Sequence, residues 1–337
     1  METQPSRSRI RRTASRWYDR VENVAAERPV HLAFYVFLGV AAIVIPISLP
    51  FYLGDTKSFL ENLAAEAHGM IFDLLVIGWF MFWLQRQGER RLRANRYREE
   101  IDDFLGWHTA EASLRIAGNV RRLNRLGVTH KLTLTEAHLK GAGLSGAHLS
   151  EADLWGAELT GAILGGAKLD GANMAGARLQ AANLERAHLH GADLRGSDLT
   201  EASLERAHLE SADLRAADLT GCDLQFASLP SAQLERACLF RANLRGARLD
   251  RANMKGALLE RANLQGAHLN GADLRESELE GADFTDANLA DAQLPEGDAL
   301  VALFCGVKSL VRTQFNDEAQ KTLHDSLPHL FEQHAAV

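Results

Sequence analysis

The stretch AHLKGAGLSGAHLSEADLWGAELTG, from Ala137 to Gly161, decides the fold of this chain. It is built from five-residue units, or pentads, that read alanine, polar residue, leucine and two variable residues, here called slots 1 to 5. The pentads continue in one register to Leu294, and there are about 32 of them. A unit this short cannot bury a core alone, so the period predicts a solenoid in which successive pentads stack.

A period of five residues fits neither standard element. On an α-helix the leucines would rotate by about 140° per pentad, and along a flat strand they would alternate between faces. If each pentad is one short straight side followed by a corner, slots 1 and 3 point toward one common axis. Small alanine and large leucine then fill the interior, and the frequent slot 5 glycines suit the corners.

At this point the chain resembles the pentapeptide-repeat family, whose motif is A-(D/N)-L-x-x. Matching pentads are ADLWG (152–156), ANMAG (172–176), ANLER (182–186), ADLRG (192–196), ANLRG (242–246) and ANLQG (262–266). The resemblance implies an all-β right-handed quadrilateral β-helix over residues 132–296, with four pentads in each coil. About eight coils at ~4.8 Å each would form a rod of ~38 Å.

Two apolar runs precede the repeats. The run from Val30 to Leu53 has no Asp, Glu, Lys or Arg, and a second run covers Met70 to Leu84. Because about 20 apolar residues cross a bilayer, we expect two transmembrane helices within residues 30–84, at about 30–53 and 63–84. The neck (YREEIDDFLGW, then RIAGNVRRLNRLG) and the tail (TQFNDEAQKTLHDSLPHLFE) also resemble segments that flank the repeats in membrane-anchored pentapeptide-repeat proteins, so we expect a member of this kind with an N-terminal transmembrane hairpin.

Arginines flank this expected hairpin on both sides. They are concentrated in an N-terminal segment, residues 1–29, and in a predicted helical juxtamembrane neck and N-terminal cap, residues 85–131. The positive-inside rule therefore predicts a multi-pass protein of the bacterial inner membrane, with both termini and the repeat domain in the cytoplasm. The lipid bilayer is then one partner, and the arginine clusters act as topology signals or contact anionic lipid head groups.

Asp73 lies inside the second apolar run. A charged carboxylate at the bilayer centre costs about 2.5 to 3.5 kcal/mol, so this residue needs a polar partner or a wet site. Two helices cannot enclose a proton or ion pathway. We therefore expect a polar helix–helix contact or an interfacial position rather than a transport role.

The ends of a solenoid need covers, because an open coil exposes its core and its unpaired backbone groups. At the C-terminal end we expect a helical cap or tail over residues 297–337. Helical spacing within it predicts a helix lying across the last coil, and the residues concerned are Leu300, Leu303, Val307 and Leu310.

Signals for catalysis, cofactors and metals are weak. The segment from Gly141 to Gly146 matches a G-x-G-x-x-G fingerprint, but no strand-then-helix context surrounds it, so no cofactor is predicted. The three cysteines lack metal-type spacing, and no Ser or Cys stands near a His and an acid in a cleft-forming segment. A twenty-residue coil would stack His188 on His208, where a metal pair is conceivable but a solvated basic stripe is the preferred interpretation. We predict neither catalytic nor metal-binding residues.

The predicted function is a non-enzymatic, membrane-tethered scaffold that binds a cytoplasmic protein or its own copies. The alternative implied by the resemblance is a DNA mimic that binds type II topoisomerases. B-DNA carries one charge per ~1.7 Å, so a ~38 Å rod would need about 22 negative charges, whereas the repeats carry a net charge of only about −8. Binding to nucleic acid is likewise not expected of an acidic repeat region.

The candidate partner surface is where the repeat pattern is least regular. Phe226 occupies a corner slot, Pro230 follows Leu229, and Phe240 occupies an outward slot. Trp155 is a second outward aromatic residue nearer the neck. Exposed apolar side chains on a polar surface mark interaction sites, although the two phenylalanines could instead fold over the corner of a neighbouring coil. In that case the surface would lie on the His188 and His208 face or at the caps.

Overall fold

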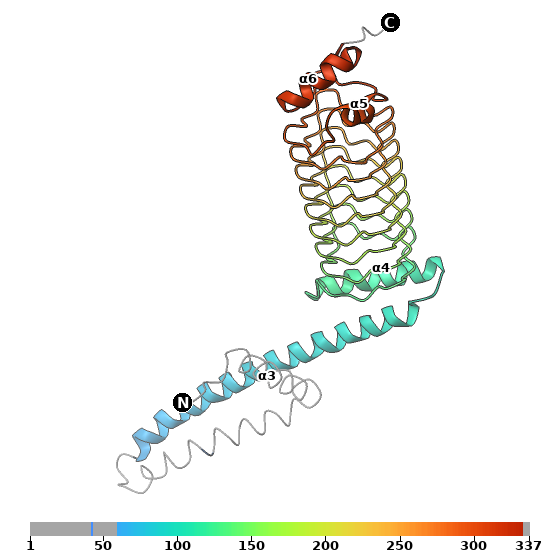
Figure 1. The fold of residues 1–337 in the computed structure, drawn as a ribbon. Coiled ribbons are helices and arrows are strands. Elements are labelled where there is room, and N and C mark those ends of the chain that lie inside the picture. Colours follow the sequence, from blue (N-terminus) through green and yellow to red (C-terminus); the bar gives the residue numbers. More distant parts are fainter. Residues whose placement is uncertain (1–41, 43–58, 333–337) are drawn as a thin grey trace, which may run out of the picture. The chain divides into compact units, whose positions relative to one another are not determined.

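The computed structural model describes residue 42 and residues 59–332 (Figure 1). The chain consists of two compact units, and the boundary between them lies between Arg96 and Tyr97. The helices are α3 (Phe59–Phe104), α4 (Ala110–Arg125), α5 (Asp298–Phe304), α6 (Asp317–Ser326) and the 3-10 helix η1 (Pro328–Phe331). Between α4 and α5 the chain winds into a stack of coils.

Each coil contains twenty residues. Parallel bridges join every slot 2 residue to the slot 2 residue twenty positions later, from Thr133 with Asp153 to Asp273 with Gln293. Four pentads therefore form one coil, as the family resemblance implied. We name the sides by the pentads of one coil and those stacked on them, and the names are side A (137–141), side B (142–146), side C (147–151) and side D (152–156).

The backbone satisfies its hydrogen bonds between and within coils. At His188 the amide donates to Ala167 of the preceding coil at 2.9 Å, and Leu189 donates to His208 of the following coil at 2.7 Å. At the corner, the Ala192 amide donates to Leu189 at 3.0 Å. From residue 141 to residue 291 slot 5 is left-handed, with φ from 52° at Ala181 to 70° at Gly281, so the turn imposes this conformation even on residues other than glycine.

The all-β expectation needs one correction, because the described residues contain bridges but no strands. Two of the five residues in each pentad form the corner, which leaves three straight residues with only one bridge among them. Because each side contributes a single isolated bridge, no run of consecutive bridged residues forms, and the straight part is shorter than the five or six residues of a typical strand. The coils are held by single bridges repeated along each side.

The core is the interior of the coils. From Ala137 to Leu289 slots 1 and 3 are buried, including Met174, Met254 and Phe284 where leucine is replaced. The buried Ser197 donates its hydroxyl to the carbonyl of Leu194 at 2.7 Å, so this polar residue is satisfied within its own corner. Burial also raises the pKa of the Cys222 thiol, which keeps it protonated.

Helix α4 covers the first coil. Ile116, Val120 and Leu123 are fully buried along one face of this amphipathic helix. Asn124 binds the exposed backbone of the coil, since its Nδ2 donates to the His148 carbonyl at 2.9 Å and its Oδ1 accepts from the His148 amide at 2.8 Å. Ser113 donates its hydroxyl to the Lys140 carbonyl at 3.0 Å. These contacts end the stack without leaving its edge unpaired.

The C-terminal end differs from the expected continuous helix. Helix α5 ends at Phe304, and the chain then returns to the β-helix in a partial coil, where Asp283 pairs with Ser309 and Asn288 with Gln314. Val307 and Leu310 therefore belong to this coil and not to a helix. The bridged residues of this coil are more than twenty positions apart because the segment containing α5 is inserted. An insertion of this kind interrupts the five-residue period, so the repeat pattern does not predict the coil.

The membrane prediction is contradicted. Among the described residues, no helix combines the length and the apolar character that crossing a bilayer requires. The predicted second span lies in α3. Its apolar run, from Met70 to Leu84, is shorter than the about 20 residues that cross a bilayer, and it contains the exposed Asp73. Apart from residue 42, the predicted first span, Val30 to Leu53, lies outside the described residues. The predicted multi-pass inner-membrane localisation is wrong on this finding. The polar contact expected of Asp73 stays a prediction.

Candidate functional site: the outer sides of the β-helix

The structure places the predicted partner residues on several sides of the coil. His188, His208 and Pro230 lie on side C, and Phe226 lies at the corner between sides B and C. Phe240 is on side A and Trp155 on side D, so the six residues do not form one patch. The twenty-residue period determines these positions, and the irregularity of the sequence around 222–240 therefore does not correspond to a single surface.

Phe226 is half exposed but packs locally. A β-carbon at Gly246, one coil further along the same corner, would lie 2.7 Å from Cδ1 and Cε1 of this ring. On the other neighbouring coil, the Arg206 guanidinium lies 5.5 Å from the ring centroid in a cation–π contact. Phe226 thus folds over the corner of the next coil, and the absence of a side chain at Gly246 provides the space.

Phe240 lies in slot 4 of side A beside two residues that the repeat pattern did not single out. Cys238 occupies slot 2 of the same pentad, and Leu258 bridges Cys238 from the next coil. The Arg241 guanidinium lies 4.9 Å from the Phe240 ring centroid. Sorting slot 2 by a period of twenty would have revealed the cluster, because side A is where Cys and Leu replace polar residues in that slot in successive coils.

His188 and His208 stack as expected, with ring centroids 5.0 Å apart and an angle of 23° between the rings. The His208 Nδ1 atom lies 3.5 Å from a carboxylate oxygen of Glu210. Burial acts to raise the pKa of Glu210, but hydrogen bonds from Ser228 and His208 contribute to lowering it below the usual value. The described residues contain no group of three or more potential metal ligands.

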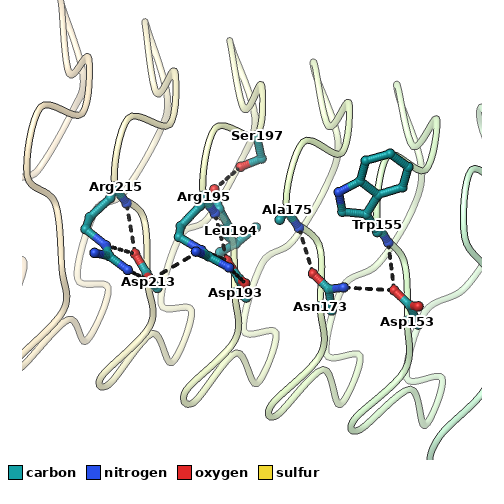
Figure 2. A network of polar contacts seen from close by, with 10 residues as sticks. All are labelled: Asp153, Trp155, Asn173, Ala175, Asp193, Leu194, Arg195, Ser197, Asp213 and Arg215. Carbon is teal, nitrogen blue, oxygen red and sulfur yellow. Dashed lines mark hydrogen bonds and ion pairs between the residues drawn. The ribbon is translucent and has the colours of Figure 1, made fainter.

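Side D carries a ladder of amides, carboxylates and arginines (Figure 2). Asn173 donates to Asp153 at 2.9 Å, whereas Arg195 donates to both carboxylate oxygens of Asp193 at 2.8 and 2.6 Å. Arg215 binds Asp213 in the same two-point way. The hydrogen bond from Arg195 is the main reason that the pKa of Asp193 is lowered. Paired in this way, the aspartates do not present a bare acidic stripe.

Two small cavities lie at the ends of the stack. A cavity of about 120 Å³ is lined by residues that include Leu294, Leu300 and Asn316, at the C-terminal cap. Another, of about 100 Å³, lies at the N-terminal end beside Ile101 and Leu132. Both are far smaller than the 300 Å³ or more of a typical small-molecule site, so the outer sides are the better candidate for function.

Comparisons with known proteins agree with this geometry. A family model described as pentapeptide repeats matches residues 133–166, 162–200, 197–236, 207–246, 237–275 and 262–296. No curated protein matched the chain.

Among solved structures, HetL of the cyanobacterium Nostoc, a pentapeptide repeat protein involved in heterocyst differentiation regulation, is 35% identical. The match covers 52% of this chain and 94% of HetL, with a TM-score of 0.32. Trypsin-treated QnrB1, a plasmid-mediated fluoroquinolone resistance protein, is 20% identical over 62% of this chain and 99% of its own, with a TM-score of 0.45.

Pentapeptide-repeat proteins form right-handed quadrilateral β-helices and are generally structural or binding proteins rather than enzymes. The repeat register, the twenty-residue coil and the family model concur. This chain belongs to the pentapeptide-repeat family.

Proposed function

We propose that this protein is a non-enzymatic scaffold whose β-helix binds a protein partner through its outer sides. The observation that carries the proposal is the separation of roles among the slots. The side chains of slots 1 and 3 are buried in the core, while those of slots 2, 4 and 5 form straight columns on the surface. A rigid array of this kind suits recognition, because its side chains are ordered before a partner arrives.

The alternative, a DNA mimic, requires a continuous acidic stripe along the rod. Side D does not supply one, since Asp193, Asp213 and Asp273 are each bound by an arginine two residues later. Side C carries lysine, arginine and histidine in the slot 2 column. These mixed charges favour a scaffold over mimicry of a uniformly charged polymer.

Site-specific photo-crosslinking in cells tests the proposal. Benzoylphenylalanine is placed in the full chain at one slot 4 position on each side, and the positions are Thr220 (A), Gln225 (B), Asp250 (C) and Glu235 (D). A scaffold predicts a discrete protein adduct from one side that exceeds those from the other three by about tenfold, since binding through one side leaves the others in solvent. Equal adducts from all four sides, or no discrete adduct from any, would contradict the proposal.

A further inference from the structure

Three apolar side chains gather on side A in two successive coils. Cys238 and Leu258 are bridge partners in the slot 2 column, and Phe240 lies in slot 4 next to Cys238. All three are partly exposed, and Thr220, which lies 3.2 Å from the Cys238 sulfur through its Oγ1 atom, borders them. We call Cys238, Phe240 and Leu258 the side A patch. Grouped apolar residues on a polar solenoid surface are typical of interaction sites.

Carboxylates lie at both ends of the patch. Along slot 2 the order is Asp218, Cys238, Leu258 and Glu278, so an acid precedes and follows the apolar pair. Glu260 and Glu280 follow Phe240 in slot 4. Within residues 59–332 none of these four acids forms an ion pair, in contrast to the aspartates of side D that arginines bind.

Glu260 gives a further indication. Its Oε2 atom is buried and has no hydrogen-bond partner within the described structure. A buried carboxylate oxygen without a donor is unfavourable, so a basic group that Glu260 could turn toward would stabilise it. Arg241 does not meet this need, because its guanidinium lies over the Phe240 ring.

The spacing of these groups specifies the partner. Asp218 and Glu278 are three coils apart, which is about 14 Å at ~4.8 Å per coil. An extended chain covers this distance in four residues at ~3.4 Å each, and its alternate side chains point to the same face. Two basic residues four positions apart would therefore reach both acids, and an apolar residue midway would lie on Leu258 and Phe240.

We propose that the side A patch binds an extended protein segment of the pattern basic-x-apolar-x-basic. This inference rests on the proposed scaffold function and names the class of partner. The acidic ends attract and position the segment, while burial of the central side chain contributes most of the affinity. A segment with reversed charge would meet like charges at both ends and be rejected.

Peptide photo-crosslinking to the full chain tests the proposal. The probe is a peptide with the core KSFSK, in which benzoylphenylalanine replaces the phenylalanine, flanked by Gly-Ser on each side. The control peptide has the core KKFSS, with the same composition but the wrong spacing, and a second control, ESFSE, reverses the charge. We expect adducts that map by mass spectrometry to side A, with a yield for KSFSK about tenfold above either control, equivalent to about 1.4 kcal/mol.

Two variants of the protein test the site independently. Phe240→Ser with Leu258→Ser removes the apolar centre, and Asp218→Asn with Glu278→Gln removes the acidic ends while keeping side-chain size. Each should lower the KSFSK yield by about tenfold at an unchanged melting temperature, because all four side chains point away from the core. The matched control, Asp170→Asn with Asp250→Asn, removes the same charge from side C and should leave the yield unchanged.

The inference is overturned if KSFSK and KKFSS react equally, if adducts spread over several sides, or if the side C control lowers the yield as much as the side A variants. If the apolar variant (Phe240→Ser with Leu258→Ser) has a lower melting temperature, the KSFSK yield of the charge variant (Asp218→Asn with Glu278→Gln) tests the inference alone. The cellular photo-crosslinking experiment tests the scaffold function separately. A discrete adduct on side B, C or D would support a scaffold while contradicting the side A assignment.

Discussion

At the scale of single residues, Gly246 and Phe226 form a pair that depends on the absence of a side chain. Gly246→Ala would place a β-carbon 2.7 Å from the ring of Phe226, which must then move away from the corner. Gly266 is the matched control, since it lies in the same column with φ of +65° against +64°, and a β-carbon added there would meet no atom within 4 Å. Both substitutions place alanine in a left-handed conformation, which costs about 1 kcal/mol.

We expect Gly246→Ala to lower the free energy of unfolding by about 1 to 3 kcal/mol more than Gly266→Ala does, measured by urea denaturation of the full chain. Adding Phe226→Ala to Gly246→Ala should remove this excess. Equal losses for the two glycines would show that the ring is free to leave the corner. Phe226 would then become available as a partner-binding residue.

At the scale of secondary-structure elements, Asn124 provides two of the side-chain hydrogen bonds that join the N-terminal cap to the first coil. Asn124 makes three hydrogen bonds, two to the backbone of His148 and one to the carbonyl of Val128 at 3.0 Å. Asn124→Ala leaves the amide and carbonyl of His148 without these partners at a covered edge, where each unsatisfied group costs about 1 to 3 kcal/mol.

We therefore expect Asn124→Ala to lower the unfolding free energy by about 2 to 4 kcal/mol. Asn270→Ala, at an outward slot of side C whose side chain forms no hydrogen bond within residues 59–332, should change it by less than about 0.5 kcal/mol. Hydrogen exchange of the first coil provides the direct readout. If protection of the His148 amide were the same in both variants, α4 would not be held by Asn124.

Asp283 stabilises the C-terminal partial coil. Burial acts to raise the pKa of this carboxylate, but hydrogen bonds from Lys308, Thr285 and Gln265 outweigh it and lower the pKa to about 2. Because the folded pKa lies below the unfolded value of about 3.9, the stabilisation is present above pH 4 and is lost as the pH falls toward 2. The shift corresponds to about 2 to 3 kcal/mol.

Asp283→Asn should thus lower the unfolding free energy by about 2 to 3 kcal/mol at pH 7, and the difference from wild type should be mostly lost at pH 2 and vanish below it. Urea denaturation of both proteins across this pH range gives the comparison. Asp291→Asn is the control, as an exposed carboxylate without an ion pair in the described structure. If the difference in unfolding free energy between the two proteins were as large at pH 2 as at pH 7, the charge of Asp283 would not be what stabilises the coil.

At the scale of the whole molecule, the repeat made the β-helix predictable, because slots 1 and 3 alone determine what enters the core. Leu139 through Leu289 and their alanines are buried as the pattern indicates. The four-sided coil needed the family resemblance, since a period of five does not say how many pentads close a turn.

Other features were not visible in the pattern. Helix α5 interrupts the register, and hydropathy along the chain cannot show that Val307 returns to a coil. Phe226 and Phe240 are close in sequence but lie on different sides, because a separation of fourteen residues is not a multiple of the coil. Leu258 and Cys238 are far apart in sequence but adjacent in space, because their separation of twenty residues is one full coil.

In the proposed mode of binding, the partner contacts columns of side chains that exist only when the coils are in register. Inserting one pentad, ADLSG, after Gly246 moves Leu258 from side A to side B while keeping every core slot filled. The same pentad after Gly166 moves all later coils together and leaves the column from Asp218 to Glu278 aligned.

The decisive measurement is the yield of the KSFSK photo-adduct on these two full-length insertion variants, with melting temperature as the check on folding. We expect wild-type yield for the insertion after Gly166 and about a tenfold loss for the insertion after Gly246, at similar melting temperatures. Equal yields from the two folded variants would contradict the proposed mode of binding, because binding would then not depend on the alignment of the coils.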